Sequence, residues 1–482
     1  MEKLLQLISD ISGEDIASLD ETDELIDDIG FDSLMIMDLV VSIKNTFDLK
    51  GDIKLSNFNP KSTIADVWTL IRIQQGEISE VCQYSKDVTN IENFPELEEF
   101  NAYYNLQKDK QPYFRVDEGI PTNHIKIDGR SYINYSTYNY LGLNGNEEVK
   151  AAAKSAIDKY GTSVSGSRLL SGEISLHGKL EKEIADFLGT DDAIVQVGGH
   201  STNVNMIGNI VGEGDLILHD ELAHNSIVQG AILSHSMRRS FKHNDMKALE
   251  KILTRLRNNY RRALIVVEGV YSMDGDTCHL PELIELKNKY GCILMIDEAH
   301  SFGTIGEHGS GICDYYHVDP SNVDILMGTL SKSGASCGGY IAGSKKFINW
   351  LKFNSPGFIF SAGITPPNTA SALKAIQIFK KDSSVVKKLQ DNSKYLLEGI
   401  KKLGFNTGLS KDTPVIPIII GESERAMKLS NELYKNGINA LPIIYPAVKE
   451  SEARIRFFLS SLHTKEDLDN TISILSKYVD WA

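Results

Sequence analysis

Residues 292–301 read CILMIDEAHS and residues 325–333 read ILMGTLSKS, and these two stretches decide the fold of most of the chain. Each begins with an apolar run of strand length and turns polar where the strand would end. Residues 263–267 and 340–342 have the same apolar character, and the amphipathic stretch 280–290 has helical spacing. Strands that alternate with helices predict an α/β sheet covered by helices.

Polar side chains follow both of these strands directly. Asp297 ends the first run, and Lys332 follows the second, framed by hydroxyl side chains. Ligands of open α/β sheets bind beyond the carboxyl ends of the strands, so both side chains are expected at one edge. A lysine there suits a Schiff base with a carbonyl cofactor, and an aspartate could keep a pyridine nitrogen protonated. Alone, the lysine also fits a surface position and the aspartate a helix cap.

Two further motifs carry candidate chemistry. Residues 219–226 read HDELAHNS, in which His219 and His224 lack the i,i+4 spacing of a helical zinc pair. The chain also lacks an HExxH motif, so we expect no metal site. His224 instead offers an aromatic face to a planar cofactor. Residues 268–275 read EGVYSMDG, a strand running into a turn, which fits either a cofactor contact or a simple connection.

The first 76 residues differ from the rest in composition. They hold 15 acidic and 6 basic side chains, and their apolar residues have helical spacing. The motif GFDSL, residues 30–34, opens the second predicted helix. Ser33 would lie in its first turn, where free N–H groups and the helix dipole favour an anion such as a phosphodiester. Asp32 and Ser33 also fit plain helix caps.

The remaining segments complete the organisation of the chain. Residues 77–94 are polar without a sustained period, and we interpret them as a linker. A flexible linker of about 20 residues has an r.m.s. span of roughly 25 Å. Toward the C-terminus, residues 415–420, 423–436 and 453–459 predict a strand, a helix and a second strand of a smaller α+β lobe.

Composition argues against several classes of protein. The net charge of −15 disfavours nucleic acid as a partner. No apolar run approaches the ~20 residues that span a bilayer, and the N-terminus lacks the pattern of a secretory signal. The five cysteines form no CxxC pair and no even-numbered framework. We therefore expect a cytoplasmic protein without a membrane span.

The N-terminal segment resembles acyl carrier proteins in its length, its acidity, its helical pattern and its GFDSL motif. This resemblance implies a small all-α carrier domain of four helices over residues 1–76. It also implies that Ser33 carries covalent 4′-phosphopantetheine, attached by a phosphopantetheinyl transferase and charged with an acyl thioester by a loading enzyme. Acidic residues near this serine would face basic partner enzymes.

Residues 95–482 resemble the α-oxoamine synthases, a family that includes 8-amino-7-oxononanoate synthase, 2-amino-3-ketobutyrate CoA ligase, 5-aminolevulinate synthase and serine palmitoyltransferase. The order and spacing of the four motifs carry this likeness over about four-fifths of the chain. It implies a homodimeric, pyridoxal-phosphate-dependent transferase of fold type I. A large mixed-sheet domain would extend to about residue 380, and the smaller lobe would cover about 381–482.

The resemblance assigns roles by motif. Lys332 would form the Schiff base with pyridoxal 5′-phosphate, Asp297 would pair with the pyridine nitrogen, and His224 would stack on the ring. His300 would join Lys332 and Asp297 in catalysis. Arg456, in EARIRF, matches the arginine that binds the amino-acid carboxylate, a two-point task suited to arginine. The remaining cofactor contacts would come from His300, Ser272, Thr329, Ser331, Gly199 and His200, with Ser361 and Ala362 of the partner subunit at the phosphate.

Some motifs narrow the assignment. Residues 138–142 read YNYLG, in which Asn139 is a substrate-binding candidate, and this form is nearer to serine palmitoyltransferase than to the NDYLG of other members. The SKS around Lys332 and the DEAHS after Ile296 favour the same subgroup. Serine is therefore the first-choice amino acid, with glycine or alanine next. Residues 198–200 read GGH where relatives have Ser or Thr, Gly, then Phe or Tyr, which affects the expected phosphate and ring contacts.

Together these resemblances imply a decarboxylative condensation of a small amino acid with an acyl thioester, giving an α-aminoketone and CO2. Lys332 would act as the base, and His300 or a nearby donor would stabilise the oxyanion. The fused carrier indicates that the donor thioester is on Ser33, in cis or across the dimer, at an effective concentration of ~mM. Two alternatives stay open: the same chemistry with free acyl-CoA, and a non-catalytic partner subunit.

Overall fold

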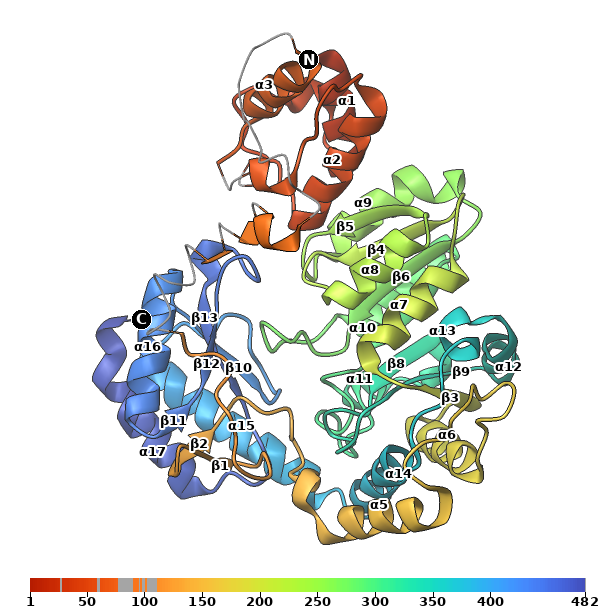
Figure 1. Cartoon of the computed structure of the whole chain (residues 1–482), viewed down its shortest axis with the longest axis vertical. Coiled ribbons are helices and arrows are strands. Elements are labelled where there is room, and N and C mark those ends of the chain that lie inside the picture. Colours follow the sequence, from red (N-terminus) through yellow and green to blue (C-terminus); the bar gives the residue numbers. More distant parts are fainter. Residues whose placement is uncertain are drawn as a thin grey trace. The chain divides into compact units, whose positions relative to one another are not determined.

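The computed structural model describes residues 1–482 apart from 27, 59–60, 77–89, 95, 98–99, 102–110 and 482. The chain divides into two compact units, Met1–Lys108 and Asp109–Ala482 (Figure 1). Most of the predicted linker, residues 77–94, and the side chain of Ser33 lie outside the described part.

The first unit is a bundle of helices whose apolar faces meet in one core. Leu4, Leu39 and Val67, each from a different helix, are fully buried there. The third helix starts at a capping box, in which Thr63 accepts a hydrogen bond from the backbone of Asp66. The predicted all-α carrier fold is confirmed. Its described elements are α1 (Glu2–Ser12), α2 (Ser33–Thr46) and α3 (Ile64–Gln75), with 3₁₀ turns η1 (Ile16–Ser18), η2 (Leu55–Asn57) and η3 (Ile91–Asn93).

The second unit contains a seven-stranded mixed sheet in the order β3-β9-β8-β7-β6-β4-β5. The five neighbouring strands β5, β4, β6, β7 and β8 are parallel to one another, and β9 runs antiparallel to both β8 and β3. The four strands predicted from apolar runs are β6, β7, β8 and β9. The bounds of all seven strands are β3 (Asp192–Gln196), β4 (Leu216–Asp220), β5 (Met237–Phe241), β6 (Ala263–Glu268), β7 (Ile293–Asp297), β8 (Ile325–Thr329) and β9 (Gly339–Gly343).

Helices cover both faces of this sheet, which explains why its strands are apolar at successive positions. Leu264 and Val266 of β6 belong to one buried cluster, and Ile265 and Val267 belong to another on the opposite face. The predicted helix over residues 280–290 is α10. The helices of this domain are α5 (Glu147–Tyr160), α6 (Ser175–Leu188), α7 (Gly199–Ile210), α8 (Asn225–Leu233), α9 (Met246–Leu256), α10 (Leu280–Tyr290), α11 (Ile312–Tyr316), α12 (Lys345–Asn354), α13 (Pro356–Ile359) and α14 (Pro366–Lys381).

The smaller lobe is α+β, as predicted, and its main sheet is antiparallel in the order β10-β13-β12. A second small sheet pairs β2 with β11, so residues ahead of the large domain also contribute to this lobe (Figure 1). Its elements are β1 (His124–Ile127), β2 (Arg130–Asn134), β10 (Val415–Ile419), β11 (Ile438–Asn439), β12 (Leu441–Ile443), β13 (Arg454–Phe458), α15 (Ser384–Lys402), α16 (Ser423–Lys435) and α17 (Lys465–Leu475). The 3₁₀ turns of the unit are η5 (Leu143–Gly145), η6 (Arg257–Asn259), η7 (Pro320–Asn322), η8 (Glu450–Glu452) and η9 (Ser476–Trp481).

Four parallel strands of the large sheet end in polar residues at the same edge. Asp220 ends β4, Glu268 ends β6, Asp297 ends β7 and Thr329 ends β8. Glu268 and Asp297 are direct register partners. The carboxyl ends of parallel strands therefore gather the predicted chemistry at one place. Among the described residues, no helix is both long and apolar enough to cross a bilayer.

Candidate active site

Lys332 lies at this edge in a partly buried, hydrogen-bonded setting. Its Nζ is 2.7 Å from Nε2 of His300, whose Nδ1 is 2.7 Å from the hydroxyl of Tyr140. Burial lowers the pKa of Lys332 to about 8, against the opposing effect of the carboxylates of Asp297 and Glu268. The neutral fraction of the amine near physiological pH is therefore far larger than that of an ordinary lysine, which favours its use as a nucleophile or base.

His300 joins this lysine to the smaller lobe. Its ring stacks on that of Phe458 in β13, with the centroids 6.0 Å apart and the planes 13° apart. Burial, and then the positive charges of Lys332 and Arg456, hold the pKa of His300 well below its usual range. A neutral imidazole has one donor and one acceptor nitrogen. The ring can therefore relay hydrogen bonding between Lys332 and Tyr140 without adding charge.

Asp297 and His224 are connected through one buried amide. Asn203 Nδ2 donates to Asp297 Oδ2 at 2.7 Å and to Ser226 Oγ at 2.9 Å. Ser226 in turn lies 2.7 Å from His224 Nδ1, which also accepts from the backbone of Ser226. These donors leave the proton of the neutral ring on Nε2, and burial lowers the pKa of His224. The carboxylate and the ring are thus held in a fixed relation.

An anion cradle lies at the start of α7. Gly198 precedes the helix, so the first backbone N–H groups, at Gly199 and His200, have no partner within the helix. Gly199 lies against Thr329 so closely that an added Cβ would be 2.8 Å from Thr329 Oγ1. Ser331 donates its backbone N–H to the same hydroxyl at 3.2 Å. This helix start, with hydroxyls beside it, has the donors that a phosphate needs.

Arg456 extends from β13 toward the same site. Its Nη1 donates to the carbonyl of Ser272 at 2.8 Å, and its guanidinium carbon lies 4.3 Å from the ring centroid of Phe458. Its Nε is buried and has no hydrogen-bond partner. Burial lowers the pKa of Arg456, yet the group stays cationic. The guanidinium is thus held in place while one of its donors, the Nε–H, has no hydrogen-bond partner in the described part of the chain.

These features fit a planar pyridine cofactor with a phosphate group. His224 provides a neutral ring, Asp297 provides a carboxylate, and the α7 start provides an anion cradle. Lys332 supplies an amine of lowered pKa. In the described part of the chain, no group of three or more histidine, cysteine or carboxylate side chains is arranged to hold a metal ion.

Other predicted residues have different surroundings. Asn139 is buried, donates to the carbonyl of Pro121 at 2.9 Å and accepts from the backbone of Asn144 at 3.3 Å. Ser361 Oγ donates to the carbonyl of Ala362 at 3.1 Å. A substrate role for Asn139 and a role of Ser361 and Ala362 at a partner's phosphate stay predictions.

His200, Ser272 and Ser331 lie at the site in different ways. The His200 ring is exposed, with its centroid 6.3 Å from that of His224. Ser272 contributes its carbonyl to Arg456, and Ser331 is exposed beside Thr329. Their predicted contacts with a cofactor stay predictions.

Sequence reasoning missed two polar residues of the site. Glu268 is buried with one unpartnered oxygen, and burial followed by the nearby Asp297 charge raises its pKa well above the usual range. It opens the EGVYSMDG motif, so its place at a strand end was available as a signal. Asn203 gave no such signal, because it lies in a helix 94 residues from Asp297 in the sequence.

The carrier motif is anchored on both sides of Ser33. Phe31 is buried in the core of the first unit, and Gly30 has a φ of 80°. Asp32 Oδ1 accepts from the backbone of Leu34 at 2.9 Å and of Met35 at 2.7 Å. Two N–H groups expected to be free for a phosphodiester are therefore taken by this cap. Ser33 is the first residue of α2, and this position is compatible with its modification. The compatibility does not depend on an open helix end.

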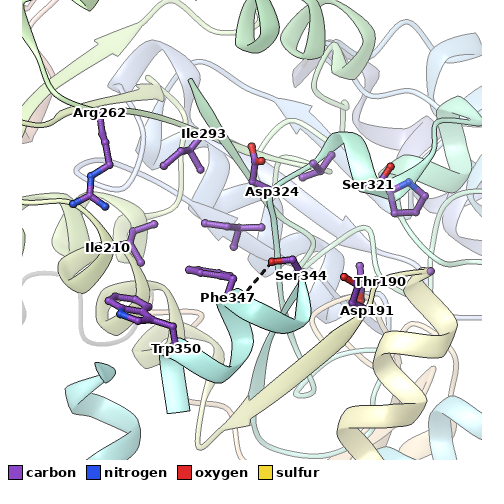
Figure 2. A pocket seen from close by; sticks show the side chains of 15 residues that line it. Thr190, Asp191, Ile210, Arg262, Ile293, Ser321, Asp324, Ser344, Phe347 and Trp350 are labelled. Carbon is purple, nitrogen blue, oxygen red and sulfur yellow. Dashed lines mark hydrogen bonds between the residues drawn. The ribbon is translucent and has the colours of Figure 1, made fainter. Parts of the chain in front are cut away.

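A cavity of about 490 Å³ lies elsewhere, at the opposite edge of the sheet. The starts of β7 and β8 and the helix α12 contribute side chains to its lining (Figure 2). Phe347 and Trp350 form an apolar wall, and Arg262 lies across from them. None of the residues described above as part of the site lines it.

Comparison with known protein families divides the chain as its two units do. The model for aminotransferase class I and II matches residues 130–475. The model for the phosphopantetheine attachment site matches residues 2–71.

Curated relatives and solved structures agree with this division. The chain is 42% identical over 365 residues to 8-amino-7-oxononanoate synthase of Thermosipho melanesiensis, covering 76% of this chain and 93% of that protein. It is 38% identical over 366 residues to serine palmitoyltransferase of Bacteroides thetaiotaomicron, covering 76% and 92%. The structure of Sphingomonas wittichii serine palmitoyltransferase is similar with a TM-score of 0.75 at 30% identity, covering 80% of this chain and 97% of that one.

Proposed function

This chain belongs to the class I and II aminotransferase family, as a pyridoxal-phosphate-dependent α-oxoamine synthase with a fused carrier domain, and we propose that it condenses a small amino acid with an acyl thioester carried on Ser33. The products are an α-aminoketone, CO2 and the free thiol. The observation that carries the proposal is the pair of Lys332, with its lowered pKa, and Arg456, with an unpartnered buried donor.

Arg456 binds the amino-acid carboxylate in this proposal. Its Nη1 already donates to the Ser272 carbonyl, so the guanidinium cannot rotate freely. The unpartnered Nε then offers, with its neighbouring donor, a two-point contact to a carboxylate. This contact orients the amino acid so that its Cα lies toward Lys332.

Lys332 holds the cofactor and then moves the Cα proton. Pyridoxal phosphate, when bound, withdraws electrons from Cα, and Asp297 keeps its ring nitrogen protonated. The neutral amine of Lys332 accepts the Cα proton, and His300 keeps that amine oriented through the 2.7 Å contact. His224 and the α7 start hold the ring and the phosphate.

The bonds balance in a simple way. A bond forms between Cα and the acyl carbon, and the thioester C–S bond breaks. The thiolate leaves and takes a proton, and the amino-acid carboxylate leaves as CO2. A proton returned to Cα completes the aminoketone. In this proposal the neutral His300, with the Tyr140 hydroxyl hydrogen-bonded behind it, stabilises the oxyanion.

We infer that the donor is the carrier's own thioester and that the amino acid is serine, with glycine and alanine next. A fused carrier raises the local donor concentration to ~mM, which lowers the need to bind free acyl-CoA tightly. The motifs YNYLG, SKS and DEAHS favour serine. We also expect a homodimer in the cytoplasm, with a phosphopantetheinyl transferase and a loading enzyme as further partners.

The test compares two donors. Phosphopantetheinylated, acyl-loaded wild type is measured against Ser33→Ala supplied with the matching acyl-CoA at an equal low concentration. We expect product only from the loaded wild type and from Ser42→Ala, a control in the same helix. Equal rates from Ser33→Ala and acyl-CoA would favour the free acyl-CoA reaction instead.

A further inference from the structure

His243 lies between two carboxylates at the margin of the active site. Its Nδ1 is 2.9 Å from Asp220 Oδ1, and its Nε2 is 2.9 Å from Asp276 Oδ2. The exposed fractions of the three side chains are 9%, 0% and 10%. No step of the reaction proposed above uses this histidine.

Geometry fixes the charge of His243. An ionised carboxylate can only accept hydrogen bonds, so both ring nitrogens must donate, and a neutral imidazole has only one N–H. The ring is therefore an imidazolium. Burial alone would lower the pKa of His243, but the bonds to Asp220 and Asp276 raise it to about 10. The other groups near it are the Tyr271 ring, 4.5 Å away between centroids, and Glu221, which accepts from the His243 backbone.

The two carboxylates belong to different walls of the site. Asp220 ends β4 and accepts from the backbone of Leu222, in the turn that leads to His224. Asp276 lies in the turn 269–279, which also contains Ser272, the residue whose carbonyl fixes Arg456. The histidine thus joins the wall that holds the ring-stacking side chain to the wall that orients the arginine.

The next residue strengthens the same connection. Asn244 donates its backbone N–H to Asp220 Oδ2 at 2.9 Å. Its Nδ2 donates to Asp276 Oδ2 at 2.8 Å and to the carbonyl of Thr277 at 3.0 Å. His243 and Asn244 together therefore bridge both walls. Of these two residues, His243 is the one that brings positive charge to the carboxylates.

We propose that His243 is a positioning residue, a cationic bridge that holds the turn 269–279 against the end of β4 and so sets the direction of Arg456. This inference rests on the proposed function in one respect, the role of Arg456 in binding the amino-acid carboxylate. The bridge itself is independent of that role. Without the cation, two buried carboxylates would face each other and repel.

The first experiment measures the bridge directly. Hydrogen–deuterium exchange of the full-length chain is compared for wild type, His243→Gln and the double variant His243→Gln/Asp276→Asn. We expect the turn 269–279 to exchange about tenfold faster in the single variant. The double variant should recover protection, because it removes one of the two repelling charges. His279→Gln, an exposed histidine of the same turn without a side-chain cap bond, is the matched control.

The second experiment measures the consequence for substrate. The amino-acid Kd is read from the visible spectrum of the holoenzyme, and we expect it to rise about 10- to 100-fold in His243→Gln. The turnover number at saturating amino acid should change much less, and the double variant should regain affinity. If His243 only fills space, the double variant should bind the amino acid at least as poorly as the single variant.

Each outcome has a separate meaning. Unchanged exchange in His243→Gln, or a double variant worse than the single, would overturn the bridge. Faster exchange with an unchanged Kd would overturn its connection to Arg456. Arg456→Lys measured in parallel reports on the proposed function alone, since that variant leaves the bridge intact.

Discussion

Replacing Arg456 by lysine tests the assignment on which substrate orientation depends. The arginine makes two contacts that fix its plane: Nη1 donates to the Ser272 carbonyl, and the guanidinium lies over the Phe458 ring, while Nε has no hydrogen-bond partner. A lysine has one compact ammonium on a flexible stem. It can bind the Ser272 carbonyl or a carboxylate in good geometry, but it cannot reproduce the two-point contact.

The magnitude follows from the hydrogen bonds that are lost. Each hydrogen bond to a charged group contributes about 1.5–3 kcal/mol, and the lysine loses at least one of them together with its alignment. A total of about 2–4 kcal/mol corresponds to a rise of about 30- to 700-fold in the amino-acid Kd. The charge is conserved, so the spectrum of the cofactor without amino acid should change little.

The assay is titration of the holoenzyme with serine, glycine and alanine, followed through the visible absorbance of the cofactor. Arg425→Lys is the control, because Arg425 also donates to a backbone carbonyl, that of Trp481, but lies on α16. An Arg456→Lys enzyme with wild-type affinity would refute the reasoning and remove Arg456 from the carboxylate site.

Three further predictions follow from the same geometry. Lys332→Ala should lose turnover and the visible cofactor absorbance, and an active, coloured variant would mean that another lysine carries the cofactor. The cofactor-free enzyme should react faster with pyridoxal phosphate as pH rises through about 8, because burial lowers the pKa of Lys332 and its neutral amine forms in that pH range. A rate profile whose midpoint lies at the pKa of an ordinary lysine would contradict this. Asn203→Leu removes the amide between Asp297 and His224 and leaves a buried carboxylate short of one donor. We therefore expect this variant to retain the cofactor more weakly in dialysis. Unaltered retention would show that the backbone alone holds these two side chains in place.

Four strands of the large sheet, β6 to β9, were predictable because both of their faces are buried. Such strands are continuous apolar runs, and the predicted strand over residues 263–267 differs from β6 only at Glu268. The strands β3, β4 and β5 were not predicted. Of these, β5 reads MRRSF, and an edge strand does not need the apolar pattern of a buried one. The helix over 280–290 was found at its bounds, since a histidine-leucine-proline start and Gly291 mark its ends.

The candidate site was predictable only where a residue ends a strand or lies in a recognisable motif. Asp297 ends β7 and lies in a motif, and Lys332 lies in a motif three residues after the end of β8. Asn203 and His243 meet neither, because their roles depend on partners dozens of residues away that only the folded sheet brings near. The prediction of a free helix end at Ser33 was wrong for a local reason, since the Asp32 carboxylate already accepts from two N–H groups of that helix end.

The separate core of the first unit has a consequence for synthesis on the ribosome. All the buried side chains of that core belong to the first 71 residues, whereas Arg456 takes its place only when β13 pairs with β10 and β12. At about 5–20 residues per second, the roughly 380 residues between the end of the carrier and Arg456 require about 20 to 80 s of translation. A carrier that folds on emergence is therefore a substrate for its modifying transferase well before the same polypeptide can bind an amino acid, and nascent chains should already carry the pantetheine arm.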